Sequence, residues 1–212
     1  IENLPDILKA LCLLKGKETK IVIENHYLGS IIEKSQFDTF YHEHPRTYSF
    51  RSFQFIASSL GMSVEKVLFP SRYGGNIRVY LGEKVSTREQ KELDYLERVE
   101  ESYSIKINGL SKKVEKWKKK KKKIIEEHVK LNGKLAAKAF PGRSAILLKI
   151  LGLDENCISN VFEKPGSLKI GHFVPGTRIP IVSDEEMVEY EMLGKPILNL
   201  AWHISSEIHE YL

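Results

Sequence analysis

Apolar residues near the start of the chain recur at helical spacing, and a β-branched run follows them. Positions 4, 7, 8, 11 and 14 are apolar and predict an amphipathic helix that Asn3 caps. The run KIVIE at 20–24 is typical of a buried strand. A second helix and two further strands are predicted at 51–60, 62–69 and 75–81. Turn residues at 71–74 join the last two strands, which are therefore predicted to pair antiparallel.

A long helical pattern occupies the middle of the chain, between Thr87 and Leu131. Its apolar positions are separated by three, four or sums of these, a period of about 3.5 residues. One unbroken helix here would be about 68 Å long at ~1.5 Å per residue, far beyond a usual globular helix. Either Asn108-Gly109 breaks the helix in two, or its apolar seam packs as a coiled coil on a second copy of the chain. The second alternative predicts a homodimer through 87–131.

After Gly133 the pattern alternates between strands and helices. Strands are predicted at 134–140, 158–163, 179–182 and 197–201, and helices at 143–151, 184–190 and 203–211. Such alternation predicts a parallel sheet, whose ligands bind at the carboxyl ends of the strands. The Gly-rich phosphate loop GxGxxG is missing. The predicted fold class is α/β, with a Rossmann-like parallel sheet in a domain at 133–212 that follows a helical linker at 86–132.

The positive charge of the chain is concentrated in the long helical region. The 33 Lys and Arg exceed the 28 Asp and Glu by five, yet residues 112–123 alone hold nine Lys and one Glu. Without that segment the balance is 24 − 27 = −3, so the basic character indicates one solvated helix surface. Binding of nucleic acid by the lysine run is the weaker alternative. No nucleic-acid partner is therefore expected.

Cysteines and apolar runs exclude further classes of protein. Cys12 and Cys157 form no CxxC or Cys/His cluster, so neither a disulfide framework nor a metal site is expected. No apolar run approaches the ~18 residues that cross a bilayer, and the first residues lack the basic start and cleavage site of a secretory signal. The chain is expected to be cytoplasmic, with no membrane partner.

The densest group of ionisable side chains is Tyr41-His42-Glu43-His44. Alternate residues of such a segment point the same way, so Tyr41 and Glu43 are expected on one side and the two histidines on the other. A histidine beside a glutamate suits a general base that works near pH 7. A surface loop with incidental histidines is the alternative. A metal site is a poorer third interpretation, because the HExxH spacing is absent.

Four separated motifs resemble those of the sugar-nucleotide C-methyltransferases and occur in the order found in that family. They are FDTFYHEHPRTYSF at 37–50, YGGNIRVY at 73–80, FVPGTRIPIVS at 173–183 and LNLAWHISSEI at 198–208. The resemblance covers nearly the entire chain. It implies an S-adenosylmethionine-dependent enzyme that methylates a carbon of a deoxysugar carried on a nucleoside diphosphate.

The resemblance also assigns roles to particular residues. Tyr41, Glu43 and His44 would form the catalytic loop. Either His44 or Glu43 would be the base that removes a proton beside a keto group, and Tyr41 would donate to the keto oxygen. The residues implied to bind the nucleotide sugar are His42, Asn76, Arg78, Arg143 and Glu163. Two of them depart from the family pattern, since Arg143 replaces a lysine and Glu163 replaces an aspartate.

The family's cofactor loop has no counterpart in this sequence. Residues 1–85 resemble the C-terminal part of a class I methyltransferase domain with its catalytic loop. No Gly-rich turn for S-adenosylmethionine is found, so no cofactor-binding residue is assigned. The chain is therefore expected to be the C-terminal portion of a longer methyltransferase, or a split product of one. The alternative is a catalytically inactive fragment that binds a nucleotide sugar or dimerises.

Overall fold

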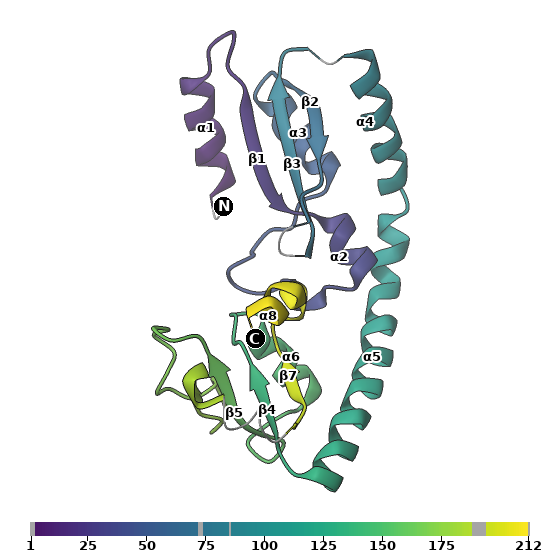
Figure 1. The fold of residues 1–212 in the computed structure, drawn as a ribbon. Helices are drawn as coiled ribbons and strands as arrows, with labels where there is room; N and C mark the ends of the chain where they lie inside the picture. Colours follow the sequence, from purple (N-terminus) through teal and green to yellow (C-terminus); the bar gives the residue numbers. More distant parts are fainter. Residues whose placement is uncertain (1–2, 72–73, 85, 188–193, 212) are drawn as a thin grey trace. The chain divides into compact units, whose positions relative to one another are not determined.

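The computed structural model divides the chain into two compact units, Ile1–Lys113 and Val114–Leu212 (Figure 1). The boundary falls within the helix α5 (Tyr103–Asn132). The structure describes residues 3–71, 74–84, 86–187 and 194–211. Each unit has its own sheet and its own buried core.

The first unit combines an antiparallel sheet with helices. Its strands are β1 (Ile21–His26), β2 (Ser63–Leu68) and β3 (Asn76–Gly82). Its helices are α1 (Leu4–Leu14), α2 (Leu28–Lys34), α3 (Phe50–Ser59), α4 (Thr87–Glu100) and the short 3-10 helix η1 (Phe37–Thr39). The strand order is β1-β3-β2, and β3 pairs antiparallel with both neighbours. The predicted antiparallel pair is confirmed, while residues 72 and 73 of its turn lie outside the described residues.

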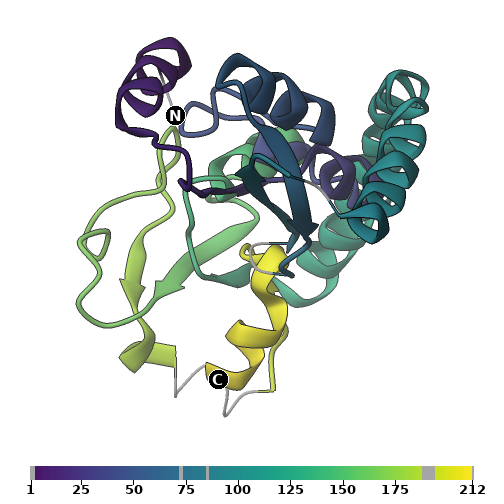
Figure 2. The ribbon, with the colours of Figure 1, turned by 90° about the horizontal axis from the view of Figure 1, so that it is seen from above.

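The two faces of this sheet differ in polarity. Ile77, Val79 and Leu81 of β3 are fully buried and pack in one cluster with Phe50 and Phe53 of α3. Figure 2 shows α1 and α3 on the same side of the sheet. The alternate residues of β1 and β3 point to the opposite face, because strand side chains alternate between faces. That face carries Glu24 and His26 of β1 and Asn76 and Arg78 of β3.

The long helical region consists of α4 and α5, and the break between them lies at Glu101 and Ser102. The predicted break at Asn108-Gly109 is wrong, because this pair lies inside α5. A glycine inside a helix costs only about 1 kcal/mol relative to alanine, which a long helix can absorb. At the observed break the Glu101 amide bonds to the carbonyl three residues back, and the Ser102 hydroxyl donates to the Val99 carbonyl at 2.8 Å. Local hydrogen bonds therefore mark the junction.

The second unit holds a sheet of four parallel strands in the order β6-β5-β4-β7. These are β4 (Leu135–Lys138), β5 (Ile158–Glu163), β6 (Ile181–Ser183) and β7 (Ile197–Asn199). Its further helices are α6 (Ser144–Leu151), η3 (Asp184–Glu186), η4 (Trp202–Ile204) and α8 (Ser205–Tyr211). The Rossmann-like α/β fold class is confirmed. Of the helix predicted at 184–190, residues 188–190 lie outside the described residues.

The second half of α5 packs on this parallel sheet beside α6. Ile125 of α5 and Leu148 of α6 belong to the same buried cluster as Ala137 and Val161 of the strands. The region predicted as a linker, 86–132, is therefore divided between the two units. The functions assigned to the predicted domains remain predictions.

Much of the apolar seam at 87–131 is covered by the chain itself. Leu93 and Leu110 are buried, and Trp117 packs against the core of the second unit. Leu131 is 79% exposed, at the far end of the seam. The homodimer through this region stays a prediction.

Candidate active site

The predicted catalytic residues lie on a segment that leaves β1 and returns to α3. β1 continues to His26, beyond the predicted strand, and is followed by α2, a helix that the sequence pattern did not predict. Ser35, with a φ of 56°, ends α2 in the left-handed conformation. The segment closes where the Leu28 amide donates to the Tyr48 carbonyl at 2.9 Å. Its first and last residues therefore lie side by side.

Residues 41–44 form a tight turn, which the His44 amide closes by donating to the Tyr41 carbonyl at 2.9 Å. The Tyr41 hydroxyl donates to Glu43 Oε2 at 2.7 Å, so these two side chains share a side as expected. The Tyr41 ring also lies 4.9 Å from the His44 ring and 5.5 Å from the His42 ring, measured between centroids. The expected separation of Tyr41 from the histidines is wrong, because the rings of both histidines lie close to the Tyr41 ring. Glu43 accepts from Tyr41 instead of from a neighbouring histidine.

Buried polar side chains directly precede this turn in the sequence. Gln36 and Asp38 are fully buried and Thr39 is 1% exposed, although all three are polar. The Gln36 side-chain amide donates to the Gly74 carbonyl at 2.9 Å, which ties the loop to the start of β3. Burying polar groups is costly unless they are hydrogen-bonded, so such contacts select one loop conformation.

Several buried polar atoms around this loop have no hydrogen-bond partner among the described residues. They are Gln36 Oε1, Thr39 Oγ1, the Tyr48 hydroxyl and Asn76 Oδ1. Unpaired buried polar groups are rare in folded proteins and indicate the position of a water, an ion or a ligand. The loop therefore has hydrogen-bonding capacity that the described protein atoms do not use.

The polar face of the sheet meets the loop at His26. The His26 ring lies 5.7 Å from the His44 ring, and His26 pairs in register with Asn76 of β3. On the same face Glu24 accepts from Asn76 Nδ2 at 2.8 Å and from Arg78 Nε at 2.7 Å. Two of the predicted substrate-binding residues, Asn76 and Arg78, therefore lie on the strand beside the turn of residues 41–44.

Sequence reasoning missed Glu24 and His26 as members of this group. A strand extended by two residues places both on one face by its period of two, and that is the signal that could have found them. Arg78 also forms an ion pair with Glu24, with an Nη2 to Oε2 distance of 2.6 Å. The hydrogen bonds to Glu24 and to Tyr80 raise the pKa of Arg78, so its charge is permanent and largely balanced.

The space beside the two glycines that precede β3 is occupied by side chains of the protein itself. Gly74 and Gly75 have φ angles of 88° and 129°, which favour glycine. A Cβ on Gly74 would lie 2.3 Å from Gln36 Nε2, and one on Gly75 would lie 2.4 Å from Ser30 Oγ. These glycines therefore let α2 and the loop approach β3, which is a packing role.

In the second unit a hollow of about 340 Å³ opens at the carboxyl ends of the parallel strands. The lining residues are Lys138, Ala139, Phe140, Pro141, Glu163, Lys164, Lys169, Ala201, Ile204 and Ile208. From β4 the sheet grows on one side by β5 and then β6, and β7 pairs with β4 on its other side. Ligands of open α/β sheets bind at such a reversal of strand order, at the carboxyl ends.

Glu163, at the end of β5, lines this hollow. Its Oε2 accepts from the Phe140 amide at 2.9 Å and lies 3.7 Å from Lys169 Nζ. Both contacts use Oε2, and the described residues make none with Oε1. The remaining oxygen is therefore available to a ligand.

Arg143 has a different environment from the one that the resemblance implies. It precedes α6, is 5% exposed, and lies over the Trp202 ring with its guanidinium carbon 5.5 Å from the centroid. It is not among the residues that line the hollow. A role for Arg143 in binding phosphate stays a prediction.

Lys138 is a further charged residue of this hollow that sequence reasoning missed. Its ammonium forms an ion pair with Asp184, and the side chains are 3% and 8% exposed. The strand pattern LAAK gave no sign of it, because lysine at a strand end is ordinarily solvated.

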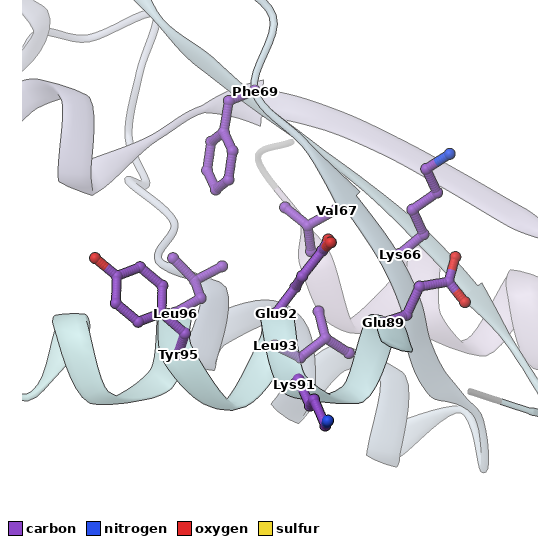
Figure 3. A pocket seen from close by; sticks show the side chains of 9 residues that line it. All are labelled: Lys66, Val67, Phe69, Glu89, Lys91, Glu92, Leu93, Tyr95 and Leu96. Carbon is purple, nitrogen blue, oxygen red and sulfur yellow. The ribbon is translucent and has the colours of Figure 1, made fainter. Parts of the chain in front are cut away.

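Two other hollows, both in the first unit, contain none of the predicted site residues. One of about 360 Å³ lies between β2 and α4, where Figure 3 shows Val67 and Phe69 facing Leu93, Leu96 and Tyr95. The other, of about 830 Å³, is open and apolar and lies between α1 and α3. Charged side chains belong to both linings, namely Lys66, Glu89, Lys91 and Glu92 in the first hollow and Lys9 and Arg46 in the second.

Among the residues that the structure describes, no group of three His, Cys, Asp or Glu is arranged to hold a metal ion. None of the described helices is both long and apolar enough to cross a bilayer.

Comparison with known proteins identifies the family. Residues 71–212 match the family described as the C-methyltransferase C-terminal domain. The chain is also 26% identical over 213 residues to C-methyltransferase NovU of Streptomyces niveus, in an alignment that covers 98% of this chain and 50% of that relative. The chain thus spans about half the length of this curated relative. On the family match over most of its length, the chain belongs to the C-methyltransferase C-terminal domain family.

Proposed function

We propose that this chain is the C-terminal portion of an S-adenosylmethionine-dependent C-methyltransferase that acts on a keto-deoxysugar linked to a nucleoside diphosphate. The observation that carries the proposal is the turn of Tyr41, Glu43 and His44, placed beside the polar strands of the first unit. The family match and the name of the relative support the reaction class.

The chemistry requires a base and an oxyanion donor. A sugar carbon beside a keto group becomes nucleophilic only after it loses a proton, and the resulting enolate can then accept a methyl group. His44 is half-buried between the Tyr41 and His26 rings, an environment that orients an imidazole. We assign His44 as the base and Tyr41 as the donor to the keto oxygen. In this structure the single Tyr41 hydroxyl proton is donated to Glu43 Oε2 at 2.7 Å, so donation to the keto oxygen requires that this bond is exchanged for one to the substrate.

The glycines at 29, 74 and 75 leave no open space for S-adenosylmethionine. The glycine that follows β1, Gly29, has no open space, because a Cβ there would lie 2.2 Å from the Tyr103 hydroxyl oxygen. The space beside Gly74 is occupied in the same way by Gln36, and the space beside Gly75 by Ser30. We assign no cofactor-binding residue in this chain. The methyl donor would be bound by parts of the full-length enzyme that correspond to the unmatched half of the relative.

The nucleotide of the substrate would bind in the hollow of the second unit. Lys164 and Lys169 line it and supply positive charge for a diphosphate. Glu163 Oε1 would accept a hydrogen bond from a ribose hydroxyl, as acidic residues at the end of the second strand do in dinucleotide-binding folds.

A catalytically inactive fragment that binds a nucleotide sugar is the alternative, which the family match and the name of the relative do not favour. Titration calorimetry of the 212-residue chain separates the two ligands. Heat with a nucleoside diphosphate sugar and none with S-adenosylmethionine would support a separate substrate-binding portion. Absence of heat with the nucleotide sugar would contradict the assignment of the second-unit hollow.

Methyl transfer by the full-length protein tests the enzyme proposal. General acid-base groups contribute about 10²- to 10⁴-fold, so His44→Ala should lower kcat by that factor. The matched control is His128→Ala, because His128 lies on α5 within the second unit and contacts Asn132. A His44→Ala variant that retains more than a tenth of the wild-type rate would remove His44 from the mechanism.

A further inference from the structure

A buried carboxylate outside the proposed catalytic turn (residues 41–44) holds together the two ends of the segment that contains this turn. This catalytic segment runs from residue 27 to residue 50. Glu100, the last residue of α4, is 5% exposed. Its Oε1 accepts from the Tyr27 hydroxyl at 2.9 Å and from the Phe50 amide at 2.7 Å. Its Oε2 accepts from the Arg51 amide at 3.1 Å. One side chain therefore contacts the residue that precedes α2 and the first residues of α3.

The placement of this carboxylate does not stabilise its own helix. A negative charge is unfavourable at the C-terminal end of a helix, where Glu100 is, and favourable at an N-terminal end. The N-terminal end that it meets is that of α3, whose first amides it accepts. Ser49 already caps α3 through the Ser52 amide, so the contacts of Glu100 add to an existing cap.

Tyrosines complete the network at the junction of α4 and α5. The Tyr27 and Tyr103 hydroxyl oxygens are 2.8 Å apart, and Tyr103 is the first residue of α5. Figure 1 shows α2 beside this junction. Gly29 makes room for the pair, since a Cβ on it would lie 2.3 Å from Tyr27 Cε1. The start of the catalytic segment is thus fixed to the break between the two helices.

We propose that Glu100 is a positioning residue for the catalytic turn, because it joins Tyr27 to the start of α3 and so sets how the intervening segment presents Tyr41 and His44. The link to catalysis rests on the function proposed above. The link to loop order does not, so the two can fail separately. Glu100 itself takes no part in the chemistry.

The test compares Glu100→Gln with Glu101→Gln. The first variant keeps two of the three acceptor contacts of Glu100 and places an amide donor against a backbone amide. The second changes an exposed neighbour, whose ion pair with Arg51 is long at 3.7 Å. Hydrogen-deuterium exchange of the 212-residue chain is read for peptides from 41–49 and from β3.

Glu100→Gln should speed exchange at 41–49 by about 10-fold or more and leave β3 unchanged, whereas Glu101→Gln should change neither. In the full-length enzyme kcat should fall by about 10²-fold with little change in the KM for S-adenosylmethionine. Unchanged exchange at 41–49 would overturn the proposal. Equal acceleration in β3 would also overturn it, because that result indicates general destabilisation.

One outcome separates this inference from the proposed function. If the wild-type enzyme transfers no methyl group while Glu100→Gln still loosens 41–49, the proposed function fails and the loop-ordering part stands. If Glu100→Gln does not fold, Tyr27→Phe replaces it, because this variant removes one hydroxyl and keeps the ring. Its exchange at 41–49 should rise as well, and unchanged exchange there would overturn the proposal.

Discussion

Replacing Lys138 by methionine would leave the Asp184 carboxylate buried without its charge partner. The two side chains are 3% and 8% exposed, and among the described residues Asp184 has no partner other than Lys138. Removing one member of a buried ion pair typically costs about 3–5 kcal/mol, because the remaining charge stays desolvated. A single domain has only about 5–15 kcal/mol in total, so about a fifth or more of the free energy of unfolding of the second unit would be lost.

Urea unfolding measures this loss. With an m-value of about 2 kcal/mol per molar, the midpoint for the second unit should fall by about 2 M in Lys138→Met. The control variant Lys149→Met, at an exposed position of α6 in the same unit, should change stability by less than about 0.5 kcal/mol. The double variant Lys138→Met with Asp184→Leu should recover most of the loss, since apolar pairs replace buried ion pairs at little cost. If Lys138→Met is no less stable than Lys149→Met, the buried ion pair does not stabilise the unit as argued.

Other predictions concern the first unit. Partial burial acts to raise the pKa of Glu65, but hydrogen bonds from Lys20 and from backbone amides lower it overall. Glu65→Gln should therefore lower the free energy of unfolding by up to about 1 kcal/mol at pH 7. The melting curves of this variant and of the wild type should converge below about pH 4, as Glu65 becomes protonated in both states. Burial, and then the hydrogen bond with Tyr103, raise the pKa of Tyr27 above its ordinary value. The free energy of unfolding should therefore fall as the pH rises beyond about 10, and it should fall less in Tyr27→Phe. An equal loss of stability at alkaline pH in the two proteins would contradict this. Gly29→Ala should destabilise the first unit by about 1–3 kcal/mol in thermal melts, because the added Cβ would collide with Tyr103. This loss is expected despite the helix preference of alanine, and a more stable variant would refute the packing described.

Elements with a strong local period were predictable from the sequence. The apolar spacing that predicts α1 and the strand-helix alternation after Gly133 each place one face on a core, and the observed elements follow them. The break between α4 and α5 was not predictable. It depends on the buried Glu100 and on Tyr103, whose partners are more than 45 residues away in the sequence. Glycine propensity pointed instead to Gly109, where a Cβ would meet no other atom within 4 Å.

The candidate site was predictable in composition and less so in geometry. Tyr41, Glu43 and His44 stand in one short motif, so spacing alone brought them together. Glu24 and His26 enter the group only through the pairing of β1 with β3, which is a tertiary fact. The burial of Arg143 against the Trp202 ring is likewise decided by packing and not by residue type.

The central claim is that His44 removes a proton from a sugar carbon. The most direct measurement is solvent deuterium incorporation at the carbon beside the keto group of a nucleotide-linked keto-deoxysugar, followed by NMR with the full-length protein and no methyl donor added. Wild-type protein and His128→Ala should exchange that position, and His44→Ala should reduce the exchange rate by about 10²-fold or more. Exchange at the wild-type rate in His44→Ala would contradict the account.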